Sequence, residues 1–147
     1  MRKSWEFAPR NGNECTISGV IDGVHILLYS LDPEADRAFF RDILHFSHVD
    51  AGEGWLIFAL PPTEMGIHPA EKPPTQAHAG HDLAAGTVYL MCEHLLETLE
   101  SLRTNGVEHT PIVEAGWGVT TSIRLPGGGS LGIYEPHHPV AIGRRTS

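Results

Sequence analysis

The 147-residue chain contains only 2 cysteines, Cys15 and Cys92, which is too few for a disulfide scaffold. A cytoplasmic location is therefore expected. No run approaches the roughly 20 apolar residues of a membrane span, and the first residues lack the apolar core of a signal peptide. Basic residues are also scarce, since 10 Lys and Arg stand against 18 Asp and Glu and give a formal charge of −8. This balance argues against nucleic acid or an anionic membrane as a partner.

What the chain does contain is a repeat. Module one, residues 19–69, runs from an apolar segment through a helix pattern to Gly-Ile-His-Pro. Module two, residues 87–137, runs through the same order to Gly-Ile-Tyr-Glu-Pro. A repeat of this length indicates a duplicated βαβββ unit. We interpret residues 1–18 as an N-terminal arm, 70–86 as a linker without regular structure, and 138–147 as a polar tail.

In module one, a buried strand is expected over residues 24–30, which form a nearly continuous apolar run. Asp32 can cap the helix that follows, and Pro33 suits its first position. One face of this helix is apolar, and three short strands are expected after it. The helix face consists of Phe39, Phe40, Ile43 and Leu44. The three strands are predicted over residues 46–49, 55–60 and 65–68.

Module two is expected to repeat this order, with a strand over residues 87–92 and a helix that ends at Asn105-Gly106. The apolar helix face and the closing strands are predicted at Leu95, Leu96, Leu99 and Leu102, and at residues 107–113, 119–125 and 131–135. The predicted fold class is α+β. Residues 19–137 would form a single domain, with two tandem βαβββ modules building a curved mixed eight-stranded sheet around a cleft.

These patterns resemble the vicinal oxygen chelate superfamily, which includes glyoxalase I, type I extradiol dioxygenases, fosfomycin-resistance enzymes and bleomycin-binding proteins. The resemblance covers about residues 20–137. It is carried by His25-Ile-Leu-Leu-Tyr-Ser-Leu-Asp32, by Leu99-Glu-Ser-Leu-Arg-Thr-Asn-Gly-Val107, and by Leu125-Pro-Gly-Gly-Gly-Ser-Leu-Gly-Ile-Tyr-Glu-Pro136. It implies the paired-module fold and a homodimer, because partner subunits commonly cover exposed sheet edges.

The resemblance also implies a metal site, with His25, His68 and Glu135 as ligands and Glu135 as the catalytic residue. Two imidazoles and one carboxylate suit one divalent ion, Fe, Mn, Ni or Zn. The fourth family position falls on Thr87, where metal-dependent members commonly have histidine. His81 can replace it only if the linker folds back.

Two of these assignments have alternatives within the sequence. Aligning Gly66 with Gly132 changes the register by one residue, matches His68 to Tyr134 and turns His68 outward. His137 and the histidine after it are either a chelating pair or exposed residues of the tail.

Strand alternation groups the side chains that would line the cleft. Tyr29 shares a face with His25, and Thr87 shares one with Tyr89, if Val88 and its neighbours on the other face cover the helices. Tyr29, Thr87 and Tyr89 are therefore candidate substrate-binding residues. Glu135, which alternates with Tyr134, is expected to face the same cleft.

The function expected from the resemblance is a small metal-dependent enzyme that acts on an organic substrate with vicinal oxygens, either as a dioxygenase or as a lyase or isomerase. The alternative is a metal-free binding protein that sequesters a drug or a small metabolite, in the manner of bleomycin-resistance proteins. Loss of one ligand at Thr87 is compatible with this alternative.

Overall fold

The computed structural model describes residues 22–142. Its first helical element joins an α-helix, α1 (Pro33–Ala38), to a π-helical turn, η1 (Phe39–Ile43). The side chain of Asp32 accepts a hydrogen bond from the amide of Ala35 at 3.2 Å, which confirms the predicted cap. Phe39 is buried in the core, and the other apolar residues of this predicted helix face pack against it.

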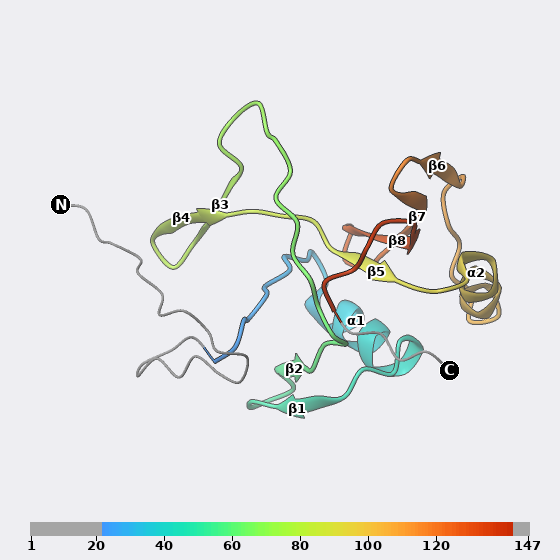
Figure 1. The fold of residues 1–147 in the computed structure, drawn as a ribbon. Helices are drawn as coiled ribbons and strands as arrows, with labels where there is room; N and C mark the ends of the chain where they lie inside the picture. Colours follow the sequence, from blue (N-terminus) through green and yellow to red (C-terminus); the bar gives the residue numbers. More distant parts are fainter. Residues whose placement is uncertain (1–21, 143–147) are drawn as a thin grey trace.

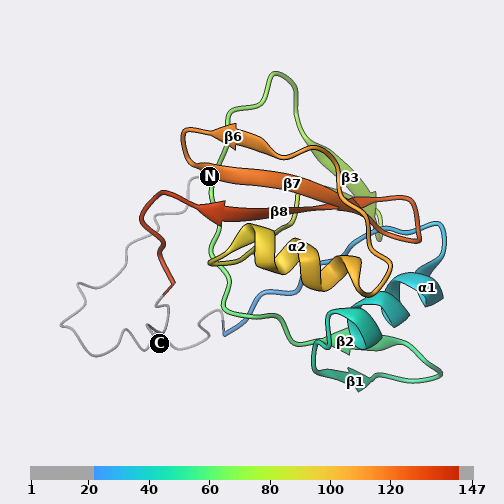
Figure 2. The same cartoon turned by 90° about the vertical axis from the view of Figure 1, so that its right-hand side faces the viewer.

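Module two forms a complete βαβββ unit. It consists of β5 (Tyr89–Met91), α2 (Leu95–Arg103), β6 (Val113–Ala115), β7 (Gly118–Arg124) and β8 (Ser130–Pro136). The sheet order is β5-β8-β7-β6; β5 and β8 run parallel, and the other neighbours run antiparallel. Helix α2 covers one face of this sheet (Figure 2). The predicted order of elements in module two is confirmed, but the first closing strand, expected over residues 107–113, lies at Val113–Ala115 instead.

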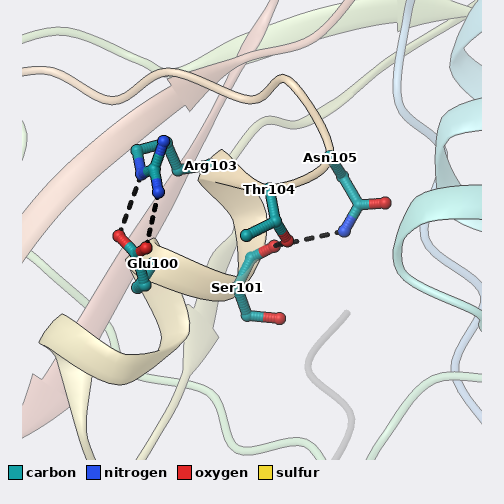
Figure 3. A network of polar contacts seen from close by, with 5 residues as sticks. All are labelled: Glu100, Ser101, Arg103, Thr104 and Asn105. Atoms are coloured by element: carbon teal, nitrogen blue, oxygen red, sulfur yellow. Dashed lines mark hydrogen bonds and ion pairs between the residues drawn. The ribbon is translucent and has the colours of Figure 1, made fainter.

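Helix α2 buries one face and ends at the predicted point. Leu95, Leu99 and Leu102 are buried, whereas Leu96 is 72% exposed because it lies outside the stripe that contacts the sheet. This corrects the expected apolar face. The chain leaves the helix at Gly106, which has a φ of 78°. Figure 3 shows the last turn, where Arg103 pairs with Glu100 at 2.6 Å and neighbouring polar side chains bond to the Ser101 carbonyl.

Module one differs from its repeat partner. Among its described residues, from residue 22 onward, only β1 (His48–Asp50) and β2 (Leu56–Phe58) form strands, as an antiparallel hairpin. The strands expected over residues 24–30 and 65–68 are not formed. If module one followed module two, these segments would pair with each other as β5 pairs with β8. Without that pairing, Val24 is 86% and Ile67 is 84% exposed.

The expected linker contains a hairpin of its own. β3 (Thr75–His78) pairs with β4 (His81–Ala84) through a two-residue turn, and Ala79 and Gly80 have φ angles of 51° and 80°. Figure 1 shows this hairpin apart from the four-stranded sheet. The described strands therefore form three separate sheets rather than the predicted single eight-stranded one. The coarser prediction of a mixed α+β fold is confirmed.

The two modules meet at the turn between β7 and β8. The amide of Gly127 donates to the buried carboxylate of Asp36 at 2.7 Å, and the Gly127 carbonyl accepts from the amide of Leu31 at 3.0 Å. A Cβ atom at Gly127 would overlap both Ser30 and Asp36. Glycine is therefore required here because module-one side chains occupy the space next to the turn. The N-terminal arm and the end of the tail fall outside the described residues.

We expect Gly127→Ala and Asp36→Ala each to lower the free energy of unfolding by about 1–3 kcal/mol. The methyl group of Gly127→Ala forces apart the contact between the modules at Gly127, which we call the clamp. Asp36→Ala leaves the buried Gly127 amide without its acceptor. Urea denaturation measures both. Gly129→Ala is the control, since a Cβ atom at that position meets nothing within 4 Å. Equal stability of the Gly127 and Gly129 variants would contradict the clamp.

Candidate functional site

The four-stranded sheet has one face covered by α2 and one open face. Leu131 and Ile133 of β8 pack in the core with the leucines of α2. Gly132 and Tyr134 alternate with them and so belong to the open face. β5 has the same arrangement, because Tyr89 pairs with Gly132 and Leu90 with Ile133. Val88 and Leu90 pack against the core, as the sequence predicted.

Tyr89 lies directly on the backbone of β8. A Cβ atom at Gly132 would overlap the Tyr89 ring, so only glycine permits this position. The Gly132 amide donates to the Val88 carbonyl at 2.9 Å, which holds the two strands in this register. Glycine inside a strand often marks such a close approach. The Tyr89 ring therefore packs in the space that a side chain at Gly132 would fill.

Three aromatic rings meet on this face and form what we call the aromatic corner: Tyr89, Trp117 and Tyr134. The ring of Tyr89 is 5.9 Å from that of Trp117 and 5.3 Å from that of Tyr134, centroid to centroid, and both pairs are nearly perpendicular. The rings of Trp117 and Tyr134 are also 5.3 Å apart and steeply inclined. Edge-to-face contacts of this kind stabilise aromatic pairs and fix their orientation.

The corner presents two of its rings to solvent. Tyr89 is 44% and Trp117 is 42% exposed, whereas Tyr134 is 8% exposed and forms the base. The carbonyl of Trp117 accepts a hydrogen bond from the His137 amide at 2.8 Å, which ties the β6–β7 turn to the chain after β8. His138 stacks on Tyr134, with its Nε2 atom 3.1 Å from the Tyr134 hydroxyl. The corner is thus a surface of two partly exposed rings that their packing on Tyr134 and Gly132 holds in place.

Glu135 lies on the opposite side of the sheet. Its Oε1 atom accepts from the Leu95 amide at 3.0 Å, at the start of α2, and its Oε2 atom is 3.2 Å from His137 Nε2. The Leu95 amide and then His137 lower the pKa of this carboxyl group. The expectation that Glu135 faces the same side as Tyr89 is therefore corrected. The carboxylate holds the helix N-terminus, where negative charge is favourable.

The remaining predicted site residues are dispersed. His25 and Thr87 are exposed. His68 is exposed too, and its Nδ1 atom lies 2.8 Å from the carbonyl of the next residue. Tyr29 contacts the β3–β4 hairpin, with its hydroxyl 2.6 Å from His78 Nδ1. Between residues 22 and 142, no group of three or more His, Cys, Asp or Glu side chains could hold a metal ion. The predicted metal set does not converge in this arrangement.

A hollow of about 450 Å³ lies between η1 of module one and the residues that follow α2 and β7 in module two, and it is open to solvent. Its floor includes Phe39, Val107 and Leu125, which are themselves residues of the packed core. The aromatic corner differs from this hollow because its exposed rings, Tyr89 and Trp117, are not residues of the packed core.

No helix in the described part of the chain is long and apolar enough to cross a membrane.

No protein-family model and no curated protein matches the sequence. Solved structures do match. One is a lactoylglutathione lyase from Agrobacterium tumefaciens, with 18% identity, 78% of this chain and 94% of that chain covered, and a TM-score of 0.51. The chain has a glyoxalase-type fold.

Two further structures share this glyoxalase-type fold. TnmS3, an antibiotic binding protein from Streptomyces sp. CB03234, has 18% identity, 80% and 99% coverage of the two chains and a TM-score of 0.52. A glyoxalase family protein from Enterococcus faecalis has 19% identity, 78% and 98% coverage and a TM-score of 0.51. The resemblance to vicinal oxygen chelate proteins is thus confirmed at the level of the fold.

Sequence reasoning found Tyr89 but missed its partners in the aromatic corner. Two glycine signals pointed to them. Gly132 interrupts an apolar strand, and the turn containing Trp117 is flanked by glycine on both sides. Glycine at such positions indicates close packing or a tight turn. Alternation alone separated Tyr134 from Glu135, but it did not show which of them faces α2.

The lowered pKa of Glu135 predicts a pH dependence of stability. A carboxyl group whose folded pKa lies below its ordinary value of 4.5 stabilises the fold above that value, and this contribution is lost as the pH falls through the lowered pKa. Glu135→Gln should therefore flatten the decline in unfolding free energy between about pH 5 and pH 3. Glu114→Gln, at an exposed site on β6, should keep the wild-type slope. Parallel curves for wild type and Glu135→Gln would contradict the assignment.

Proposed function

We propose that the protein binds and sequesters a small organic molecule, a drug or a metabolite, on the aromatic corner. The observation that carries this proposal is the pair of partly exposed rings, Tyr89 and Trp117, which lie nearly at right angles to each other, with the Tyr89 ring packed on Gly132. Aromatic side chains with few rotatable bonds supply large contact areas at low entropic cost, and small-molecule sites are mainly lined by such residues. Thr120 pairs with Tyr134 across the sheet and adds a polar group beside the rings.

The fold is compatible with this function. TnmS3 shares the fold and is an antibiotic binding protein, and the lyase from Agrobacterium tumefaciens shares it as well. The fold alone therefore does not choose between binding and catalysis. Our preference for binding rests on the aromatic corner, which needs no metal, and on the separation of the predicted metal ligands.

Binding of neutral aromatic fragments, followed by saturation-transfer NMR, tests the proposal. We expect Trp117→Leu to weaken binding about tenfold, because one stacking surface is lost. Gly132→Ala should weaken it as well, since the added methyl group displaces the Tyr89 ring. Trp55→Leu is the matched control, because Trp55 is an exposed tryptophan in module one. Equal binding by the Trp117 and Trp55 variants would show that the corner is not the site.

The metal-dependent enzyme predicted from the sequence is the second candidate. Glu135 and His137 offer an ionised carboxylate and an imidazole 3.2 Å apart, and the lowered pKa keeps that carboxylate charged. In the described residues, no third His, Cys, Asp or Glu side chain joins Glu135 and His137 in a group that could hold a metal ion. The set as arranged does not fit a divalent ion, and we derive no reaction step through one.

Native mass spectrometry of untagged protein, after incubation with Fe(II), Mn(II), Ni(II) or Zn(II), tests the predicted metal and the predicted homodimer together. From the dispersed ligands we expect no stoichiometric metal in wild type. One tightly held ion per chain, absent from a His25→Ala, Glu135→Ala double variant, would overturn the binding proposal in favour of the enzyme. The same spectra report whether the chain is monomeric or dimeric.

A further inference from the structure

The hollow between the two modules has features of a binding site that the aromatic corner does not involve. Its volume of about 450 Å³ is that of a pocket for a small molecule, since such pockets measure roughly 300–1,000 Å³. Its walls come from η1 of module one and from the residues after α2 and β7 of module two. Leu125, in one wall, lies two residues before Gly127, so an occupant of the hollow would link the modules beside the clamp.

The floor of the hollow is apolar. Phe39, Val107 and Leu125 are buried in the packed core and still border the hollow. Ile43, which is partly buried, adds an apolar side chain from η1. An apolar group placed here removes the surface of these side chains from water, which is favourable in proportion to the area covered. The floor therefore suits the apolar part of a ligand.

The wall from module one has an uncommon backbone. Its π-helical turn is closed by a hydrogen bond of 3.1 Å from the Leu44 amide to the Phe39 carbonyl, five residues back. Turns of this kind are rare in proteins and are frequently found at functional sites. Phe39 and Ile43, the first and last residues of the turn, both line the hollow. The irregular part of this helical element is thus the part that shapes the wall.

Two opposite charges lie at the rim. Glu108 and Arg124 line the hollow and are exposed. Because the bridge between His109 and Ile123 is antiparallel, Glu108 and Arg124 follow it as the next pair of opposed residues. Opposite charges in such positions commonly pair with each other.

Glu108 and Arg124 do not pair in this structure. Between residues 22 and 142, ion pairs join Arg41 to Asp42, Arg103 to Glu100 and His137 to Glu135. Neither rim residue belongs to one of them. The rim therefore offers a carboxylate and a guanidinium group next to each other, and each is available to a charged group of a ligand.

We propose that this hollow binds a small zwitterion with an apolar body, of which a free apolar α-amino acid such as leucine is the simplest example. The side chain of the ligand lies on the apolar floor. Its carboxylate pairs with Arg124, and its ammonium group pairs with Glu108. A ligand with one charge satisfies only one of the two rim residues, whereas a zwitterion satisfies both. This site is separate from the aromatic corner and does not depend on the function proposed for it.

Titration of ¹⁵N-labelled protein, followed by two-dimensional NMR, tests the inference with four probes: L-leucine, glycine, N-acetyl-L-leucine and L-leucinamide. At about pH 6.5 the amine of leucinamide is protonated. We expect leucine to shift the amide signals of Gly106, Val107 and Leu125 in a saturable manner. Glycine should bind more weakly because it has no apolar body. N-acetyl-L-leucine and L-leucinamide, which each keep one charge, should bind about two- to fivefold more weakly than leucine.

Two variants assign the charges. Arg124→Gln should weaken the binding of leucine and N-acetyl-L-leucine but not that of leucinamide, because only the first two have a carboxylate. Glu108→Gln should weaken leucine and leucinamide but not N-acetyl-L-leucine. Glu114→Gln, at an exposed site on β6, is the matched control and should change none of them.

Two results would overturn the inference. If leucine leaves the signals of Gly106, Val107 and Leu125 unshifted, the hollow is not its site. If the three leucine compounds bind equally, or if the two rim variants bind leucine as the control does, the rim charges do not recognise the ligand and the zwitterion class is wrong.

Discussion

The alternation of side chains along β8 is the constraint on which the rest of the structure depends. Leu131 and Ile133 must be buried beneath α2, and burial of such side chains is the main favourable contribution to folding. Because successive side chains of a strand point to opposite faces of the sheet, Gly132 and Tyr134 must then lie on the open face. Glu135, one residue on, returns to the α2 side and reaches the Leu95 amide. The core, the helix start and the aromatic corner are thus set by one register.

The same register explains why the corner is rigid. Tyr89 is held from below by Gly132 and from the side by Trp117 and Tyr134. A surface of this kind loses little conformational entropy when a ligand covers it, since the rings are already fixed in place. The carboxylate on the other side of the sheet has a different role, because it holds the start of α2. One short strand therefore separates the proposed binding surface from a structural contact.

Much of module two could be predicted from the sequence, because its signals are local. The helix stop at Gly106 and the order of strand and helix patterns depend on residues close together in the chain. The Asp32 cap in module one is local in the same way. What local patterns did not supply was the partner of each strand. The segments of residues 24–30 and 65–68 have strand composition but remain unpaired, because a strand needs a neighbour that composition does not specify.

The site was harder to predict for the same reason. Alternation divides β8 into two sets of side chains, but only the packing of α2 decides which set is covered. The β3–β4 hairpin was missed because its turn begins with Ala79, a residue that seldom adopts a positive φ. The clamp at Gly127 joins residues far apart in sequence, and only its run of glycines was visible beforehand. The aromatic corner is thus built by long-range contacts, which local propensities do not specify.

The most direct test of this account is a nuclear Overhauser spectrum of the Gly132 α-protons in uniformly labelled protein. We expect cross-peaks to the Tyr89 ring protons, with upfield shifts of the glycine signals because the ring lies over them. Cross-peaks from Gly132 to the leucine side chains of α2 would contradict it. That result would place Glu135 on the open face, as expected from the sequence, and would make its carboxylate part of the candidate site.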